Sequence, residues 1–188
     1  VMPHFLSSLT SAALLILSGT SAADGGDWLV DGAPYVATAA ISDDAKRVDL
    51  DNGLLRRSIV LLPNAATVAF DNLMTGQSEL RSVRPEATVT INGVAYSVGG
   101  LEGQPIHNGR TAERFPWRPR SEWLSRPATW PAPGVSLAID FRPPEGAPQD
   151  LRGVTVTVHY ELFDAMPLLS KWISITNEGA APITLDAF

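Results

Sequence analysis

The sequence predicts an all-β fold, an antiparallel β-sandwich, and three observations support this prediction. Several short segments alternate apolar and polar residues with a period of two, which places every second side chain on the same face of an extended strand. Turn residues separate these segments, and glycine and proline are frequent, with 15 of each in 188 residues. Outside the first 23 residues no segment sustains a helical period. Hydrophobic residues make up 45% of the chain, so a packed core is expected.

The first strands are predicted after residue 40. Residues 46–50 and 54–62 are extended segments joined by Asp51-Asn52-Gly53. Because Asn-Gly readily supplies two positive φ angles, we expect a β-hairpin with a type I′ turn at Asn52-Gly53. Residues 67–72 form a further candidate strand.

The clearest alternation lies in residues 85–98. Ala87, Val89 and Ile91 alternate with threonines, and Asn92-Gly93 then turns the chain into residues 94–98. This pattern predicts a second tight hairpin, which ends at Gly99-Gly100. Residues 135–141 are another predicted strand, ended by Pro143-Pro144.

The C-terminal part is predicted to be a long hairpin of residues 154–163 and 168–176. If its turn is centred on Ala165-Met166, His159 lies opposite Trp172 and Glu161 lies opposite Ser170. His159, Glu161 and Trp172 would then share a polar face, which could bind a sugar or transfer a proton. The alternative is an ordinary face that is half-solvated or covered by a neighbouring segment. Lys171 would be a charged exception on the opposite, apolar face.

Between residues 100 and 134 the strand pattern is interrupted by a segment rich in tryptophan, arginine and proline. Loops of this length are often functional. Indole rings can stack on sugar rings while arginine and glutamate bind hydroxyl groups, so Trp117, Arg118, Glu122 and Trp123 are candidate carbohydrate-binding residues. Alternatively, the tryptophans anchor the segment or pack against a second domain, and the arginines form surface ion pairs. A third interpretation, binding of single-stranded nucleic acid by the basic and aromatic residues, is disfavoured by the negative net charge and the export signal.

The ends of the chain predict its organisation. Residues 1–23 lack charged side chains and contain an apolar run followed by small residues, which is typical of a cleaved signal peptide and predicts secretion to the periplasm or exterior. A buried N-terminal helix or a disordered tail is the alternative. Residues 24–40 are expected to form a flexible arm and residues 41–188 the β-sandwich domain. The strand-like run 183–188 has no closing turn, so we expect the domain to be truncated there.

Charge and cysteine content exclude several function classes. The formal net charge of −6 disfavours nucleic acid as a partner. The apolar run within residues 1–23 is too short to span a membrane, and no membrane span is expected after the leader is removed. The absence of cysteine excludes thiol catalysis and thiolate metal sites. His4, His107 and His159 do not have metal-ligand spacing, and no catalytic motif is present, so no catalytic residue, metal or cofactor is predicted.

Two stretches of the sequence are similar to a known family. The first is residues 52–57 with 63–67, and the second is residues 156–163 with 167–172 and 175–177. Together they resemble the N-terminal domain of α-galactosidase (melibiase)-like glycoside hydrolases. The resemblance implies a galactose-mutarotase-like supersandwich, followed in the full enzyme by a barrel that carries the catalytic carboxylates. Since no barrel is present in residues 1–188, the family's catalytic residues have no counterpart here.

The function expected is therefore a non-catalytic N-terminal β-sandwich domain of a secreted carbohydrate-active enzyme, an α-galactosidase-like glycoside hydrolase whose catalytic domain would follow Phe188. Its expected partners are carbohydrate and that catalytic domain. A free-standing carbohydrate-binding or cell-surface module is one alternative. An aldose-mutarotase-like enzyme that uses His107 or His159 with Glu161 is another.

Overall fold

A computed structural model describes residues 26–101, 118–128, 133–143 and 146–188, with the backbone alone described in 118–128. These parts of the chain are almost entirely β-structure, with a single short 3-10 helix at Gln149–Leu151. All strand pairs are antiparallel. The all-β, antiparallel prediction is confirmed.

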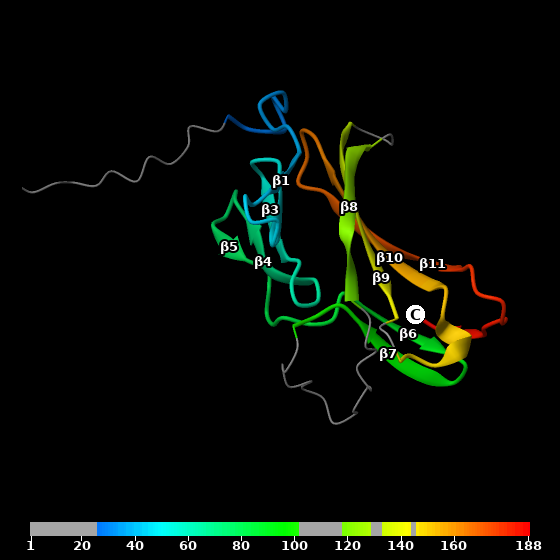
Figure 1. Ribbon diagram of the computed structural model, residues 1–188. Helices are drawn as coiled ribbons and strands as arrows, with labels where there is room; N and C mark the ends of the chain where they lie inside the picture. Colours follow the sequence, from blue (N-terminus) through cyan, green and yellow to red (C-terminus); the bar gives the residue numbers. More distant parts are fainter. Residues whose placement is uncertain (1–25, 102–117, 129–132, 144–145) are drawn as a thin grey trace, which may run out of the picture.

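The strands form three sheets (Figure 1). The five-stranded sheet runs in the order β1-β2-β3-β4-β5, which are Thr38–Ile41, Arg47–Asp51, Leu55–Val60, Ala66–Asn72 and Gln77–Ser78. The four-stranded sheet has the order β11-β10-β9-β8, which are Leu169–Asn177, Val154–Phe163, Gly134–Arg142 and Arg118–Ala128. The three-stranded sheet has the order β12-β6-β7, which are Leu185–Ala187, Ala87–Ile91 and Val94–Val98.

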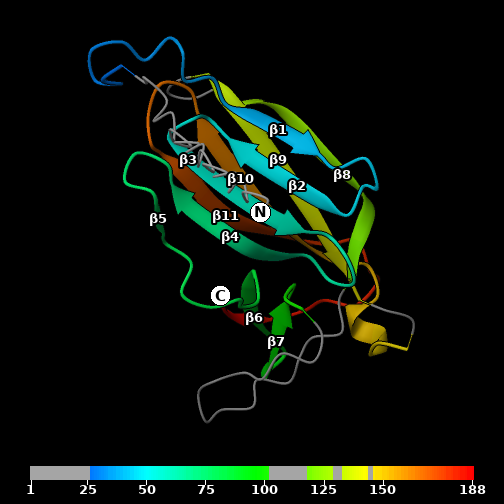
Figure 2. The same cartoon turned by 90° about the vertical axis from the view of Figure 1, so that its left-hand side faces the viewer.

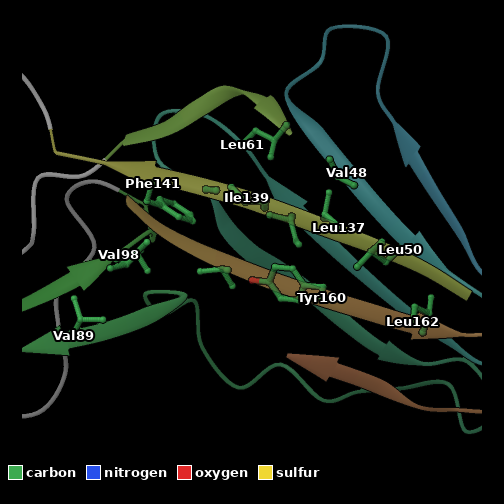
Figure 3. Packing of buried hydrophobic residues seen from close by; sticks show 14 of the residues in the cluster. Val48, Leu50, Leu61, Val89, Val98, Leu137, Ile139, Phe141, Tyr160 and Leu162 are labelled. Atoms are coloured by element: carbon green, nitrogen blue, oxygen red, sulfur yellow. The ribbon is translucent and has the colours of Figure 1, made fainter. Parts of the chain in front are cut away.

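The two larger sheets face each other, and the small sheet lies at one end of both (Figures 1 and 2). Their facing side chains form one hydrophobic cluster, which also takes in Val89 and Ile91 of the small sheet. Figure 3 shows Val48 and Leu50 pointing toward Leu137 of the opposite sheet. Full burial of each such side chain stabilises the fold by about 1.5–3 kcal/mol. Because alternation places the apolar side chains of a strand on one face, these apolar faces are the ones that pack against each other.

One of the two predicted Asn-Gly turns has the expected geometry. Asn92 and Gly93 have φ angles of 51° and 76° between β6 and β7, as a type I′ turn requires. The prediction of a type I′ turn at Asn52-Gly53 was wrong. The β2–β3 register makes Gly53 and Leu54 the central residues, and only Gly53 has a positive φ, which is the pattern of a type II′ turn.

The side chain of Asn52 explains why the turn is shifted by one residue. Its Oδ1 accepts hydrogen bonds from the N–H groups of Leu54 and Leu55 at 3.0 and 2.9 Å. Its Nδ2 donates to the carbonyl groups of Phe163 and Met166 at 2.7 and 2.8 Å. Asn52 is buried, and it therefore ties the β2–β3 turn to the β10–β11 turn of the opposite sheet.

Strand β8 lies within the segment where the sequence showed no strand pattern, so that expectation was wrong. Among the described strands, β8 lies at the edge of its sheet and pairs with β9 alone, with an irregular register between Pro119 and Trp123. Proline interrupts the alternation that predicts a strand, yet an edge strand tolerates proline because one side of its backbone has no neighbour to bond.

The regular structure begins within the segment expected to be an arm, because β1 pairs with β2 from Thr38 onward. The buried Ala37 donates its backbone N–H to Asp164 Oδ1 at 2.6 Å. Within the described ranges, no helix has the length and apolar character needed to cross a membrane.

Candidate functional site

The outer face of the four-stranded sheet carries the polar residues that the sequence singled out. Along β10, valines and Tyr160 are buried toward the five-stranded sheet, while Thr155, Thr157, His159 and Glu161 alternate with them and are partly exposed. The register places His159 between Ala138 of β9 and Trp172 of β11. Glu161 lies opposite Ser170, so both predicted cross-strand pairs are confirmed.

His159 and Trp172 form a stacked pair on this face. Their ring centroids are 5.0 Å apart and their planes differ by 7°. His159 Nε2 is 2.8 Å from Ser174 Oγ, which fixes the orientation of the imidazole. Because the ring separation matches the spacing between neighbouring strands, the two rings stand upright on the sheet and stack along its hydrogen-bonding direction.

One face of the Trp172 indole therefore covers His159, and the other is directed away from β10. Trp172 lies on β11, which is the edge strand of the described sheet, and remains 42% exposed. The neighbouring outward positions on β10 and β11 carry the hydroxyl groups of Thr157, Ser170 and Ser174 and the carboxylate of Glu161. Thr157 donates its hydroxyl hydrogen to Asp140 Oδ1 at 2.7 Å. The arrangement combines a flat apolar ring with hydrogen-bonding groups beside it.

The structure describes only some of the candidate carbohydrate-binding residues of the tryptophan-rich segment, and of those it describes the backbone alone. Trp117 and His107 lie outside the described residues. The backbone positions of Arg118, Glu122 and Trp123 are on β8, with Arg118 opposite Arg142 and Trp123 opposite Ile139. The structure thus puts these positions in the same sheet as His159, but with β9 between them.

A second polar cluster, centred on Glu86, was missed by the sequence analysis. Glu86 precedes β6, and its side chain is only 2% exposed. Its Oε2 accepts hydrogen bonds from the Tyr160 hydroxyl and from Lys171 Nζ, the latter at 2.7 Å, and lies 3.5 Å from Arg57 Nη2. Its Oε1 accepts the backbone N–H of Thr67 at 2.5 Å.

Cations and rings surround the carboxylate of this Glu86 cluster. Arg57 lies over the Tyr160 ring at 4.8 Å and over Phe70 at 5.5 Å, and Lys171 lies 5.3 Å from the Tyr160 ring centre. Arg57 also donates to Thr67 Oγ1 through Nε and Nη2, at 3.0 and 2.7 Å. The buried carboxylate is therefore fully hydrogen-bonded and paired, as the cost of burying a charge requires.

The pKa values reflect these contacts. Burial raises the pKa of Glu86, but the charge and hydrogen bond of Lys171 and the hydrogen bond from Tyr160 outweigh it and hold the pKa below its ordinary value. Burial, and to a smaller extent the negative charge of Glu86, raises the pKa of Tyr160 well above its ordinary value. Burial lowers the pKa of Lys171, although the Glu86 carboxylate opposes this.

The Glu86 cluster joins the three sheets, since it unites the entry to β6 with Arg57 of β3, Thr67 of β4, and Tyr160 and Lys171 of the β10–β11 hairpin. One indication of this cluster was present in the sequence, namely the charged Lys171 on an otherwise apolar face of the predicted hairpin. No local pattern links it to Glu86, which lies 85 positions away in the sequence.

The acidic residues near β2 have partners of their own. Asp44 pairs with Lys46, Asp49 with Arg47, and Asp51 with Arg56. In the part of the chain that the structure describes, no group of three histidine, aspartate or glutamate side chains is placed to hold a metal ion.

No protein-family model, curated protein or solved structure matches the chain.

Proposed function

We propose that the chain is a non-catalytic β-sandwich module of a secreted carbohydrate-active enzyme, of the α-galactosidase-like glycoside hydrolase type, and that it binds carbohydrate on the outer face of β10 and β11. The observation that carries this proposal is the exposed Trp172 indole stacked on His159. A partly exposed tryptophan on an otherwise polar face suits a binding contact, because its ring is apolar while its N–H can donate a hydrogen bond.

The chemistry of this face suits a sugar ring. One side of a pyranose ring is lined by C–H groups and packs on an indole, while its edge carries hydroxyl groups. Ser170, Ser174 and Glu161 lie on the same face as Trp172 and offer donors and acceptors for those hydroxyls. Aromatic residues with a polar surround are also favoured at interfaces, because they bury a large area with little loss of side-chain entropy.

The arrangement of the sheets supports the module part of the proposal. Two facing antiparallel sheets with one shared core agree with a sandwich, and the long β10–β11 hairpin is the segment that resembles the supersandwich domain of the family. Secretion and the following catalytic domain rest on the leader-like residues 1–23 and on that resemblance. A free-standing carbohydrate-binding module would use the same face.

The proposal is tested by titrating the purified chain with a panel of oligosaccharides and following binding by calorimetry and tryptophan fluorescence. Trp172→Ala should weaken the binding of any saccharide ligand by about five- to a hundredfold, the range that corresponds to the roughly 1–3 kcal/mol that a base stacked on an aromatic ring contributes. Trp172→Phe keeps a smaller aromatic surface and should retain part of the affinity. Leu168→Ala, an exposed change in the β10–β11 turn, serves as the control.

Two results would overturn the proposal. One is the absence of binding to every saccharide in the panel. The other is an acceleration of sugar anomer exchange that is lost in His159→Ala, because this would identify a mutarotase-like enzyme in place of a non-catalytic module.

A further inference from the structure

The outer face of the four-stranded sheet continues into a pocket of about 510 Å³ at the end of β9 and the start of β10. Arg142, Arg152, Thr155 and Glu178 are among the residues that line it. Thr155 belongs to the same outward row of β10 as His159. Four residues of extended chain separate them, so the pocket begins about 13 Å from the His159–Trp172 pair.

Two arginines, Arg142 and Arg152, line this pocket. Both Arg142 and Arg152 are exposed, and neither takes part in an ion pair or a side-chain hydrogen bond within the described ranges. A third arginine, Arg118, lies directly opposite Arg142 in the β8–β9 register. Two exposed cationic side chains at one pocket stand out in a chain whose net charge is −6.

The wall of the pocket near Arg152 is closely packed. Gly153 has a φ of +93°, and a Cβ atom there would lie 2.6 Å from the backbone N of Gly179. A Cβ atom on Gly179 would lie 2.3 Å from the carbonyl oxygen of Arg152. Glu178 N–H donates to the Gly153 carbonyl at 2.9 Å. Contact between these two turns holds the backbone of Arg152 and Glu178 in place.

We infer that this pocket binds an oxyanion, namely the carboxylate or sulfate group of an acidic saccharide whose other end stacks on Trp172. The guanidinium group presents a planar fork of donors that matches both kinds of oxyanion. Among the described lining residues, Glu178 supplies a carboxylate that opposes an anion, and Arg142 and Arg152 outnumber it. The inference rests on the proposed function and narrows its ligand to an acidic saccharide.

The test compares three ligands of equal chain length on the intact chain: a neutral oligosaccharide, its uronic-acid counterpart and its sulfated counterpart. Inorganic sulfate is titrated separately. The acidic saccharides should bind at least tenfold more tightly than the neutral one at low salt, and the advantage should shrink as salt is added. A preference for the uronic acid or for the sulfate ester identifies which group the pocket takes.

Matched variants assign the effect to the pocket. Arg142→Gln and Arg152→Gln should each remove most of the preference for acidic ligands and leave binding of the neutral saccharide unchanged. Glu178→Gln should strengthen acidic binding several-fold. Arg81→Gln makes the same change of charge at an exposed position outside the pocket and should have no effect beyond a small uniform shift.

The outcomes separate the two proposals. Equal binding of neutral and acidic saccharides, unaffected by the arginine variants, overturns the anion site and leaves the sugar-binding face intact. Arginine-dependent binding of sulfate without binding of any saccharide supports the anion site and overturns the proposed function. Tighter binding of the neutral ligand overturns the inference directly.

Discussion

The hydroxyl group of Tyr160 donates a hydrogen bond to the carboxylate of Glu86, although 74 positions separate the two residues in the sequence. Tyr160 lies in the middle of the core in Figure 3, and Glu86 leads into the small sheet. With Lys171 and Arg57 as ion-pair partners, this carboxylate is a single point at which all three sheets are bound to one another. Its removal should therefore affect the whole fold.

Glu86→Gln is expected to lower the free energy of unfolding by about 3 kcal/mol at pH 7. Removing one member of a buried ion pair leaves the other charge uncompensated, and such changes typically cost 3–5 kcal/mol. The lower end applies because Lys171 is 28% exposed and water screens it in part. Urea denaturation measures the change. The same substitution at the exposed Glu79 is the control and should cost less than about 0.5 kcal/mol.

The stability of the protein should fall in acid, and Glu86 should account for part of the fall. Because the pKa of Glu86 is lower in the folded state, the unfolded state binds the proton first, and the stabilisation is present above about pH 4.3 and lost as the pH drops through the folded value. Unfolding midpoints measured from pH 6 to pH 3 should decline less steeply in Glu86→Gln. Asp49, whose lowered pKa acts in the same direction, is kept in both proteins. Parallel curves would show that Glu86 keeps its ordinary pKa when folded.

Asn52→Ala is expected to cost about 3 kcal/mol of stability. The change deprives two N–H groups and two carbonyl groups of their partners, and a buried unsatisfied polar group costs about 1–3 kcal/mol. Asn52→Asp should be similarly harmful because it places an oxygen where the Nδ2 donor was. Asn72→Ala removes only exposed bonds to Met74 and Thr75 and is the control. Equal thermal shifts for Asn52→Ala and Asn72→Ala would contradict the proposed role of Asn52.

Gly134→Ala should destabilise the fold by about 3 kcal/mol through overpacking. A Cβ atom at this position in β9 would lie 2.2 Å from the carbonyl oxygen of Leu162 and 2.9 Å from Phe163 Cα, so β9 and β10 would have to separate. Gly26→Ala has no atom within 4 Å of the added Cβ and should change the melting temperature very little. A Gly134→Ala protein as stable as the parent would show that the strands can move apart without cost.

Most strands could be predicted because alternation is a local property. The β6–β7 and β10–β11 hairpins and their turns follow from neighbouring residues, and the opposition of His159 and Trp172 follows from one turn position. β8 was missed because its prolines break the alternation that reveals a strand, and only its place at the edge of the sheet makes them tolerable. The turn at Asn52 was misplaced because its side chain binds a distant carbonyl, which no local pattern encodes.

By itself, the sequence determined the all-β class, the faces of the long hairpin and the exposed pairing of His159 with Trp172, since each depends on side chains a few positions apart along a strand or across a single turn. The tertiary structure alone decided that Lys171 is neutralised by Glu86, that Asn52 joins two turns, and that Arg142 and Arg152 meet at one pocket. The physical reason is that these contacts form only when the sheets pack together, and the packing depends on the burial of the whole core.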